Sequence, residues 1–268
     1  MSKVYIQGVS VLGPGLPDWN QSQAVLNGSE ECEVQPLQLS AVSSLPANER
    51  RRASRISKMA IRVAEEAMAH SAMASMDQAT VFASSCGDLD IVDKICSALT
   101  MEDKPVSPIQ FHNSVHNAQA GYWAIANQVH QASSSISAYT GSFSAGLLEA
   151  ATYINIEQVP VLLIAYDRPA PGVLFSSAPS RYEFAVAMLL VPKPHKGSIA
   201  CLQIDLCAAG QNEHSKCHSS VLDEVRLGNP AARALPILES LARKDSTEIV
   251  LPYLSYLDVV VSINEYDQ

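Results

Sequence analysis

The stretch that decides the fold runs Ser135-Ile136-Ser137-Ala138-Tyr139-Thr140-Gly141-Ser142-Phe143-Ser144-Ala145-Gly146. Its first five residues are predicted to form a strand, and the residues after Gly141 a helix, with a tight turn at Thr140-Gly141. The backbone N–H groups and the dipole at the start of a helix favour an anion. Enzymes place nucleophiles at such corners, because the side chain gains a lowered pKa and a neighbouring oxyanion site. Thr140 is therefore the first candidate functional residue.

Strand-like and helix-like segments alternate on both sides of this corner. Strands are expected at residues 4–8, 79–83, 135–139, 159–165, 183–191, 198–206, 248–251 and 257–263. Helices are expected from Glu49 through residues 56–67, and at 89–99, 114–129, after Gly141, and at 229–243. The stretch 28–46 and the His- and Ser-rich stretch after residue 206 are expected to be loops. With no internal repeat, the alternation predicts one α/β layer fold around a largely buried sheet.

Composition narrows the class of protein. The chain has 268 residues, of which 47% are hydrophobic and 17% charged, with a net charge of −9. This excludes a disordered or fibrous chain and argues against a nucleic-acid binder. The longest apolar run, residues 159–166, is too short to span a bilayer, and no signal peptide opens the sequence. We therefore expect a soluble, cytoplasmic protein with neither nucleic acid nor a membrane as partner.

The cysteines and histidines predict neither a metal site nor a cofactor. Six cysteines stand at irregular spacings, which is typical of reduced thiols in a chain without an export signal. One cluster was weighed as a zinc site: Cys201, Cys207, His214, Cys217 and His218. It contains no C-x-x-C pair, and a mobile surface loop is the simpler interpretation. His112 and His116 lack the glutamate that follows the first histidine in zinc proteases.

The corner and its surroundings resemble the ketosynthases of the thiolase-like superfamily. Thr140 stands where those enzymes carry the acyl-accepting cysteine of a T-A-C-[AST]-S-G motif. Further matches follow in order at residues 4–15, 84–89, Asn117, Gly121 and 183–191. The resemblance implies a thiolase-like, ketosynthase-type N-terminal half with a mixed central sheet flanked by helices. It divides the chain into a ketosynthase-like domain, 1–195, and a shortened C-terminal extension, 196–268, packing on the same fold.

The departures from that family bear on activity. A threonine hydroxyl is a poor nucleophile without an adjacent base, so Thr140 cannot form the thioester by the cysteine route. The two histidine motifs of the ketosynthases, H-G-T-G-T and N-x-K-x-x-x-G-H, are absent, and the sequence ends where the second thiolase-like half would begin. We therefore expect no catalytic residue and no condensing activity.

A ketosynthase-type fold without the cysteine resembles a chain length factor. The S-F-x-A-G-L-L-E-A segment at residues 142–150 is similar to that of the chain-length-factor-like subunits of bacterial aryl polyene clusters. The resemblance implies a heterodimer in which an active ketosynthase extends the acyl chain and the factor closes the far end of the tunnel. The bulk of its side chains then sets polyene or polyketide length, and an acyl carrier protein engages the complex.

The same resemblance assigns residues to the partner interface and to the tunnel. Pairing across the dimer axis falls to the predicted strand of Ser135, Ile136, Ser137, Ala138 and Tyr139. Gln110 and Phe111 match the position that reaches into the partner's tunnel, and Cys86 matches the tunnel gate. Tyr122 and Trp123 are expected to plug or line the cavity. The alternatives are a small buried thiol for Cys86 and ordinary helix core for the two aromatic residues.

Two other functions remain open from the sequence. A serine acyl hydrolase or transferase would use Ser144 in a near G-x-S-x-G turn, with Asp167 or Asp205 and then His214 or His218. A pure interaction protein would use the basic cluster of residues 50–58 to dock an acidic carrier protein, although a solvated helix face is the favoured explanation of that cluster. Product length and the choice between heterodimer and homodimer are not readable from the sequence.

Overall fold

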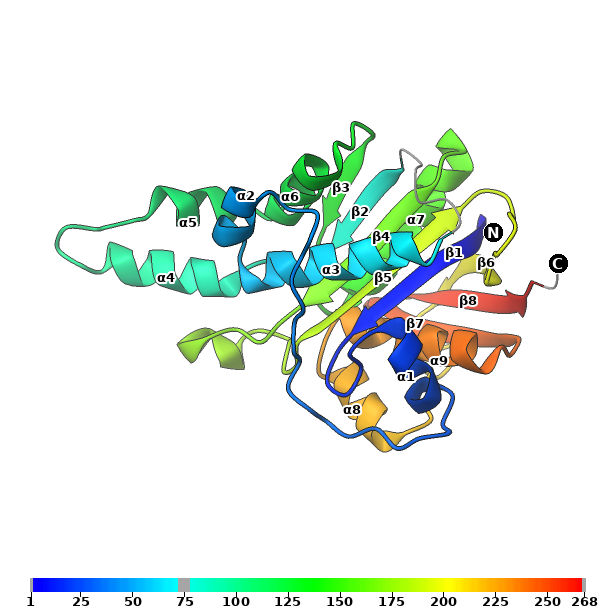
Figure 1. The fold of residues 1–268 in the computed structure, drawn as a ribbon. Helices are drawn as coiled ribbons and strands as arrows, with labels where there is room; N and C mark the ends of the chain where they lie inside the picture. The colour runs from blue at the N-terminus through cyan, green and yellow to red at the C-terminus, as the bar shows by residue number, and fades with distance from the viewer. Residues whose placement is uncertain (1, 72–77, 267–268) are drawn as a thin grey trace.

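The computed structural model describes residues 2–71 and 78–266, and in them the strands form one eight-stranded sheet. In spatial order the strands are β3-β2-β4-β5-β1-β6-β8-β7 (Figure 1). Their bounds are β1 Ser2–Leu12, β2 Ala79–Ala83, β3 Ser133–Ile136, β4 Val161–Asp167, β5 Phe184–Val191, β6 Ala200–Ala208, β7 Thr247–Leu254 and β8 Leu257–Glu265.

The helices connect and cover these strands. The α-helices are α1 Trp19–Leu26, α2 Ala47–Arg52, α3 Arg55–Ala69, α4 Leu89–Leu99, α5 Pro108–Asn113, α6 Ala118–Asn127, α7 Ser142–Glu157, α8 Ser220–Leu227 and α9 Leu235–Arg243. Three short 3-10 helices are η1 Tyr139–Gly141, η2 Gly172–Ser176 and η3 Ala231–Ala234. No helix in the described part of the chain is long and apolar enough to cross a membrane.

The sheet is mixed. Strand β2 runs parallel to both β3 and β4, whereas each later neighbour in the order, from β4·β5 to β8·β7, is antiparallel. Strands β4 and β5 are buried along their whole length, as expected for central strands covered on both faces. Strands β3 and β7 are the two edges.

Helices cover both faces of the sheet, and the alternation of side chains along each strand supplies both cores. In β4, Leu162 and Ile164 belong to the cluster that contains α3, while Leu163 and Ala165 belong to the cluster that contains α7. Figure 1 shows α3 lying across the sheet. On the α7 side, a Cβ on Gly146 would stand 2.8 Å from the Cβ of Ala83, so the absence of a side chain lets α7 approach β2 closely. The prediction of an α/β fold with a mixed sheet between helices is confirmed.

A helical hairpin of α4 and α5 projects away from the sheet (Figure 1). An ion pair between Asp90 in α4 and Arg168, just after β4, ties its base to the sheet. Arg168 Nε also donates to Glu183 at 3.2 Å, and Arg55 of α3 binds the same carboxylate at 2.6 Å. The two arginines lower the pKa of Glu183 below its usual range although burial alone would raise it. The network joins the hairpin to α3 and β5 through charged groups.

Most predicted elements are confirmed, and the differences have local causes. Strand β2 and helix α4 have the predicted bounds. The helix expected from Glu49 is broken at Ala53, which is extended, and Ser54 then caps α3 by accepting from the Ser57 N–H. The helix expected at 114–129 begins only at Ala118, after a turn. Three helices, α1, α5 and α8, were not predicted.

The strand expected at 135–139 is wrong beyond Ile136. Ser137 leaves the ladder and donates its hydroxyl hydrogen bond to the Ser85 carbonyl at 2.8 Å. Tyr139 has a positive φ of 51°, which no strand residue adopts, and it opens η1. The strand instead starts earlier, at Ser133, whose hydroxyl accepts a hydrogen bond from Thr80 at 2.8 Å.

Candidate functional site

The predicted corner exists, and a buried serine fixes its shape. The chain leaves β3, passes through η1 and enters α7 at Ser142. The Ser142 hydroxyl donates to the Tyr139 carbonyl at 2.7 Å and accepts from the Ala138 N–H at 3.0 Å. Thr140 is exposed at the tip of the corner. No described side chain caps the start of α7, where the Ser142 N–H is bonded to the Tyr139 carbonyl of η1, and the positive end of the helix dipole lies beside Thr140.

Strand β7 closes the other side of the corner. A Cβ on Gly141 would overlap the carbonyl oxygen of Tyr253, so only glycine fits at this point. One turn further along α7, Ser144 donates its hydroxyl hydrogen bond to the Pro252 carbonyl at 2.7 Å. The turn between strand and helix is therefore held by the C-terminal part of the chain.

These contacts remove the support for the serine hydrolase. Ser144 is 0% exposed, and its only proton is donated to a carbonyl of β7. His214 Nε2 lies 2.9 Å from the carboxylate of Asp258. The Asp167 carboxylate accepts from Ser84 and Ser85 at the end of β2. The proposed nucleophile, base and acid therefore do not form a catalytic triad around Ser144.

The loop after β2, which carries Cys86, is held by a buried carboxylate. Asp167 accepts hydrogen bonds from the Ser84 hydroxyl at 2.9 Å and from the Ser85 N–H at 2.9 Å. Burial raises the pKa of Asp167 to about 7, although these hydrogen bonds oppose the shift. Cys86 is half-buried next to them, with its Sγ 3.5 Å from the Ser85 hydroxyl. The loop thus has a fixed backbone with one accessible thiol.

This loop lies beside the corner. Ser137, just before η1, donates to the Ser85 carbonyl at 2.8 Å. On its other side, His116 Nε2 lies 3.1 Å from the Ser84 carbonyl. The structure therefore brings the Cys86 loop, the approach to Thr140 and the turn between α5 and α6 together.

The remaining predicted tunnel residues fall into two environments. Gln110 and Phe111 lie on α5 in the projecting hairpin, and the Phe111 side chain is 67% exposed. Tyr122 and Trp123 are buried in α6, where the Tyr122 hydroxyl donates to Asn113 at 2.9 Å and burial raises the pKa of Tyr122. Phe111 faces outward and Gln110 is half-buried, whereas the second pair packs inside this subunit.

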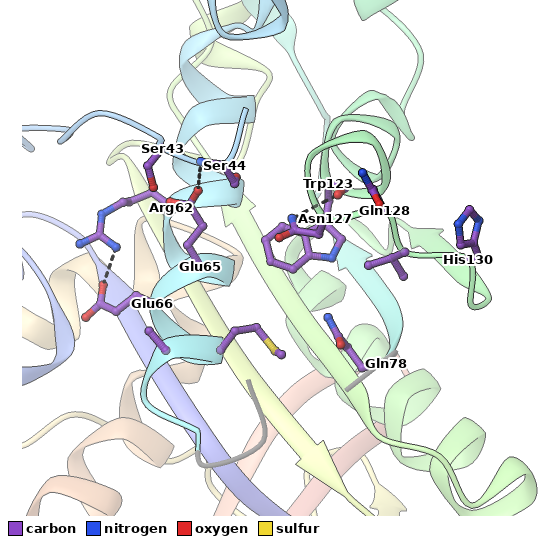
Figure 2. Close-up of a pocket in the computed structure, with 13 residues that line it drawn as sticks. Ser43, Ser44, Arg62, Glu65, Glu66, Gln78, Trp123, Asn127, Gln128 and His130 are labelled. Carbon is purple, nitrogen blue, oxygen red and sulfur yellow. Dashed lines mark hydrogen bonds and ion pairs between the residues drawn. The ribbon is translucent and has the colours of Figure 1, made fainter. Parts of the chain in front are cut away.

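Trp123 borders a cavity of about 760 Å³ between α3 and α6. Figure 2 shows its indole between Ser44 and Glu65 on one side and Gln78 on the other. The indole Nε1 is buried and bonds no other described residue. Neither Thr140 nor Cys86 lines this cavity, so it is separate from the corner.

A second cavity, of about 920 Å³, opens in front of Thr140 and was not foreseen. Apart from Thr140 it is lined by the C-terminal part of the chain, including His214, Arg226 and Arg233. The one sequence signal for it was Asp258, an acid inside the otherwise apolar strand pattern of 257–263. In the structure Asp258 is buried and binds His214 at 2.9 Å.

The residues weighed as metal ligands do not converge. Among residues 2–71 and 78–266, no group of three or more His, Cys, Asp or Glu side chains could hold a metal ion. All six cysteines are free thiols. Cys201 lies on β6, whereas the buried Cys217 precedes α8 and its N–H donates to Asp223 at 2.8 Å.

The family model for the N-terminal domain of beta-ketoacyl synthases matches residues 18–247. The chain belongs to this family. No curated protein matches the sequence. Membership of the β-ketoacyl synthase family agrees with the mixed sheet between two helical layers.

Solved structures of this fold extend over the whole chain. One is "Ketosynthase (ApeO) in Complex with its Chain Length Factor (ApeC) from Xenorhabdus doucetiae", with a TM-score of 0.74, 22% identity, and coverage of 98% of this chain and 99% of that chain. "The ishigamide ketosynthase/chain length factor" gives a TM-score of 0.75 at 11% identity, with both chains covered completely. A type II acyl carrier protein in complex with its ketosynthase, AntDE:AntF, gives 0.80 at 12% identity, with 99% of each chain covered. At these identities the likeness establishes the thiolase-like ketosynthase fold.

Proposed function

We propose that this chain is a non-catalytic chain length factor that pairs with an active ketosynthase and shapes the acyl tunnel of the complex. The observation that carries the proposal is the strand-to-helix corner, which presents the exposed hydroxyl of Thr140 at the position where the resemblance expects the acyl-accepting residue. In the ketosynthase motif this position is a cysteine. A threonine without an adjacent base is a poor acyl acceptor.

An apolar surface on the projecting hairpin supports a protein partner. Large hydrophobic side chains are exposed along α4, α5 and the η2 segment: Leu99, Met101, Ile109, Phe111, Val115, Val173 and Phe175. The two elements α4 and η2 are in contact, and Figure 1 shows both on the side of the molecule away from the termini. Concentrated apolar exposure of this kind marks an interaction surface. Two of the similar solved structures are described as ketosynthases with chain length factors.

The edge of the sheet offers a second contact. Among the described strands, β3 pairs with β2 alone, so one side of its backbone is open to a strand of another chain. We assign Ser135 and Ile136 to this pairing. Ser137, Ala138 and Tyr139 then contribute as the loop that follows, with Tyr139 exposed.

The positions of the proposed tunnel residues in the fold suggest a role for each of them in the complex. Phe111, with Gln110 beside it, can reach into a partner because it projects from the body of the fold. Cys86 gates the tunnel from the loop beside Thr140. Tyr122 and Trp123 shape the wall from inside this subunit. The product class we propose is an aryl polyene or a related polyketide, its length set by the bulk of these side chains.

The carrier protein meets the complex mainly through the ketosynthase. Of the basic cluster, Arg55 is bound to Glu183 at 2.6 Å and Arg52 to Glu49 at 3.4 Å, while Arg51 is exposed. The solved AntDE:AntF complex pairs an acyl carrier protein with its ketosynthase. We also assign residues 1–195 to the ketosynthase-like domain and residues 196–268 to a shortened extension. Strands β6, β8 and β7, which continue the sheet beyond β1, support that assignment.

The test is co-expression with an active ketosynthase, followed by size exclusion with mass determination and an acyl-loading assay. We expect a one-to-one complex with acyl mass only on the partner's cysteine. Thr140→Ala should leave loading unchanged. Phe111→Ala should lengthen the products or weaken the complex, because it removes bulk from an exposed ring. Ile156→Ala is the matched control, since Ile156 is as exposed but lies on α7 away from the hairpin.

A different result would contradict the proposal. Acyl mass on this chain would identify an acyl acceptor of its own. A chain that stays monomeric or homodimeric beside the ketosynthase would exclude the heterodimer. Equal effects of Phe111→Ala and Ile156→Ala on assembly and product length would remove the hairpin from the interface.

A further inference from the structure

The cavity in front of Thr140 contains an arginine whose Nε has no acceptor in the described part of the chain. Arg233, in η3, lines the cavity, and its Nε is buried without a hydrogen-bond acceptor. No hydrogen bond or ion pair joins its guanidinium to any other described residue. Burial lowers the pKa of Arg233 and the charge of Arg226 acts in the same direction, while the nearby carboxylate of Asp223 opposes the shift in part. Arg233 is half-buried, and a donor such as its buried Nε is unfavourable without an acceptor, so this position favours an oxygen acceptor from a ligand.

The neighbouring acids are already engaged. Asp223 binds Arg226 through both oxygens, with Nε–Oδ1 at 2.6 Å and NH2–Oδ2 at 3.2 Å. Asp258 binds His214 at 2.9 Å. Arg226 is only 4% exposed, so its pairing with Asp223 is a buried one that leaves no free carboxylate for Arg233. Glu213 also lines the cavity, but it is exposed and bonds none of these cations.

The other residues that line the cavity could contact an organic group attached to the anion. Lys216 adds a second cation, and the positive end of the α7 dipole lies next to Thr140. Leu227 and Leu254 line the same space with partly exposed side chains. A volume of about 920 Å³ is larger than a bare ion needs.

We propose that this cavity binds a small organic oxyanion, a carboxylate or a phosphate ester, whose charged group pairs with Arg233. The guanidinium presents a planar fork that matches two oxygens of such a group. Lys216 lies on the same wall, and the apolar part of the ligand extends along Leu227 and Leu254 toward Thr140. The site is independent of the tunnel role proposed above, because none of the proposed tunnel residues lines it.

Calorimetric titration of the purified full chain tests the site with three probes: inorganic phosphate, octanoate and uncharged octanol. We expect at least one anion to bind and octanol not to bind. Binding of phosphate alone would identify a phosphate ligand, and binding of octanoate alone a carboxylate ligand; both support the site. Arg233→Gln should weaken anion binding by about tenfold or more, since it removes the charge and keeps most of the volume.

The matched control is Arg243→Gln, because Arg243 is partly exposed, is already bound to Asp245 at 2.8 Å and does not line the cavity. It should leave anion binding unchanged. A thermal unfolding series without ligand gives an independent readout: Arg233→Gln should raise the midpoint of unfolding, because it removes a donor, Nε, that is buried without a described acceptor. The proposal is overturned if neither anion binds, or if both bind Arg233→Gln as tightly as the unmodified chain.

Discussion

The backbone carbonyl of Tyr253 occupies the space that a side chain on Gly141 would need. The two residues are more than a hundred positions apart, and the contact joins the edge strand β7 to the corner that carries Thr140. The bond from Ser144 to the Pro252 carbonyl lies next to it. The shape of the candidate site therefore depends on the C-terminal part of the chain.

Replacement of Gly141 by alanine should destabilise the fold, because the opposing group is backbone and cannot rotate away. We expect a loss of about 1–3 kcal/mol in the free energy of unfolding, measured by urea denaturation. Gly121→Ala is the control. Gly121 lies in α6 with nothing within 4 Å of the new methyl group, so this variant should gain about 0.5–1 kcal/mol. Equal effects of the two variants would contradict the contact.

Local sequence patterns predicted most of the sheet but not what surrounds the corner. Strand β5 is buried on both faces, so its continuous apolar run was enough to identify it. Helix α5 has Pro108 at its start and only six residues, too few for a helical period to show. Helix α8 begins at a Ser219 cap inside a polar stretch, and that cap was the available signal.

In the candidate site, too, the sequence predicted the local turn but not the distant residues that surround it. The turn at Thr140 could be predicted because strand, turn and helix follow one another in the sequence. The partners of that turn were not, because Tyr253, His214 and Arg233 come from β7, a loop and η3. Ser144 looked like a nucleophile from its neighbours alone; its burial against Pro252 depends on a strand pairing that sequence spacing does not encode.

Asp167 should make stability depend on pH. Its pKa rises from an ordinary 3.8 to about 7 in the folded chain. Between these values the unfolded carboxyl is ionised while the folded one keeps its proton, so the folded state binds more protons. The contribution to stability is therefore complete below about pH 4 and is lost as the pH rises through about 7, on the order of 4 kcal/mol in total.

Asp167→Asn removes the titrating carboxyl. The difference in stability between the two proteins therefore reports the pH dependence of Asp167 without that of the histidines. The amide keeps an acceptor for Ser84 but sets an N–H against the Ser85 N–H, so the variant should be less stable at pH 5. Its deficit should shrink by pH 8, where the unmodified carboxylate is ionised. Urea midpoints of both proteins across this range provide the measurement, and parallel profiles would exclude the raised pKa.

Trp123 offers a test of what its buried indole contributes. Its Nε1 bonds no other described residue, so Trp123→Phe removes an unsatisfied donor and should change the free energy of unfolding by less than about 1 kcal/mol. Trp123→Ala removes the whole ring from the α3–α6 core and should cost about 3–5 kcal/mol. Chemical denaturation of both variants measures this difference. A large loss in the phenylalanine variant would mean that the indole N–H has a partner.

Ser144→Ala separates a structural serine from a catalytic one. The hydroxyl is fully buried and donates to Pro252, so its loss leaves a buried carbonyl without that partner. We expect about 1–3 kcal/mol lower stability, with assembly and acyl loading of the ketosynthase complex unchanged. Ser97→Ala, at an exposed position in α4, should leave stability nearly unchanged and serves as the control. Labelling of the unmodified chain by a fluorophosphonate probe, lost in Ser144→Ala while stability is retained, would instead identify Ser144 as a nucleophile.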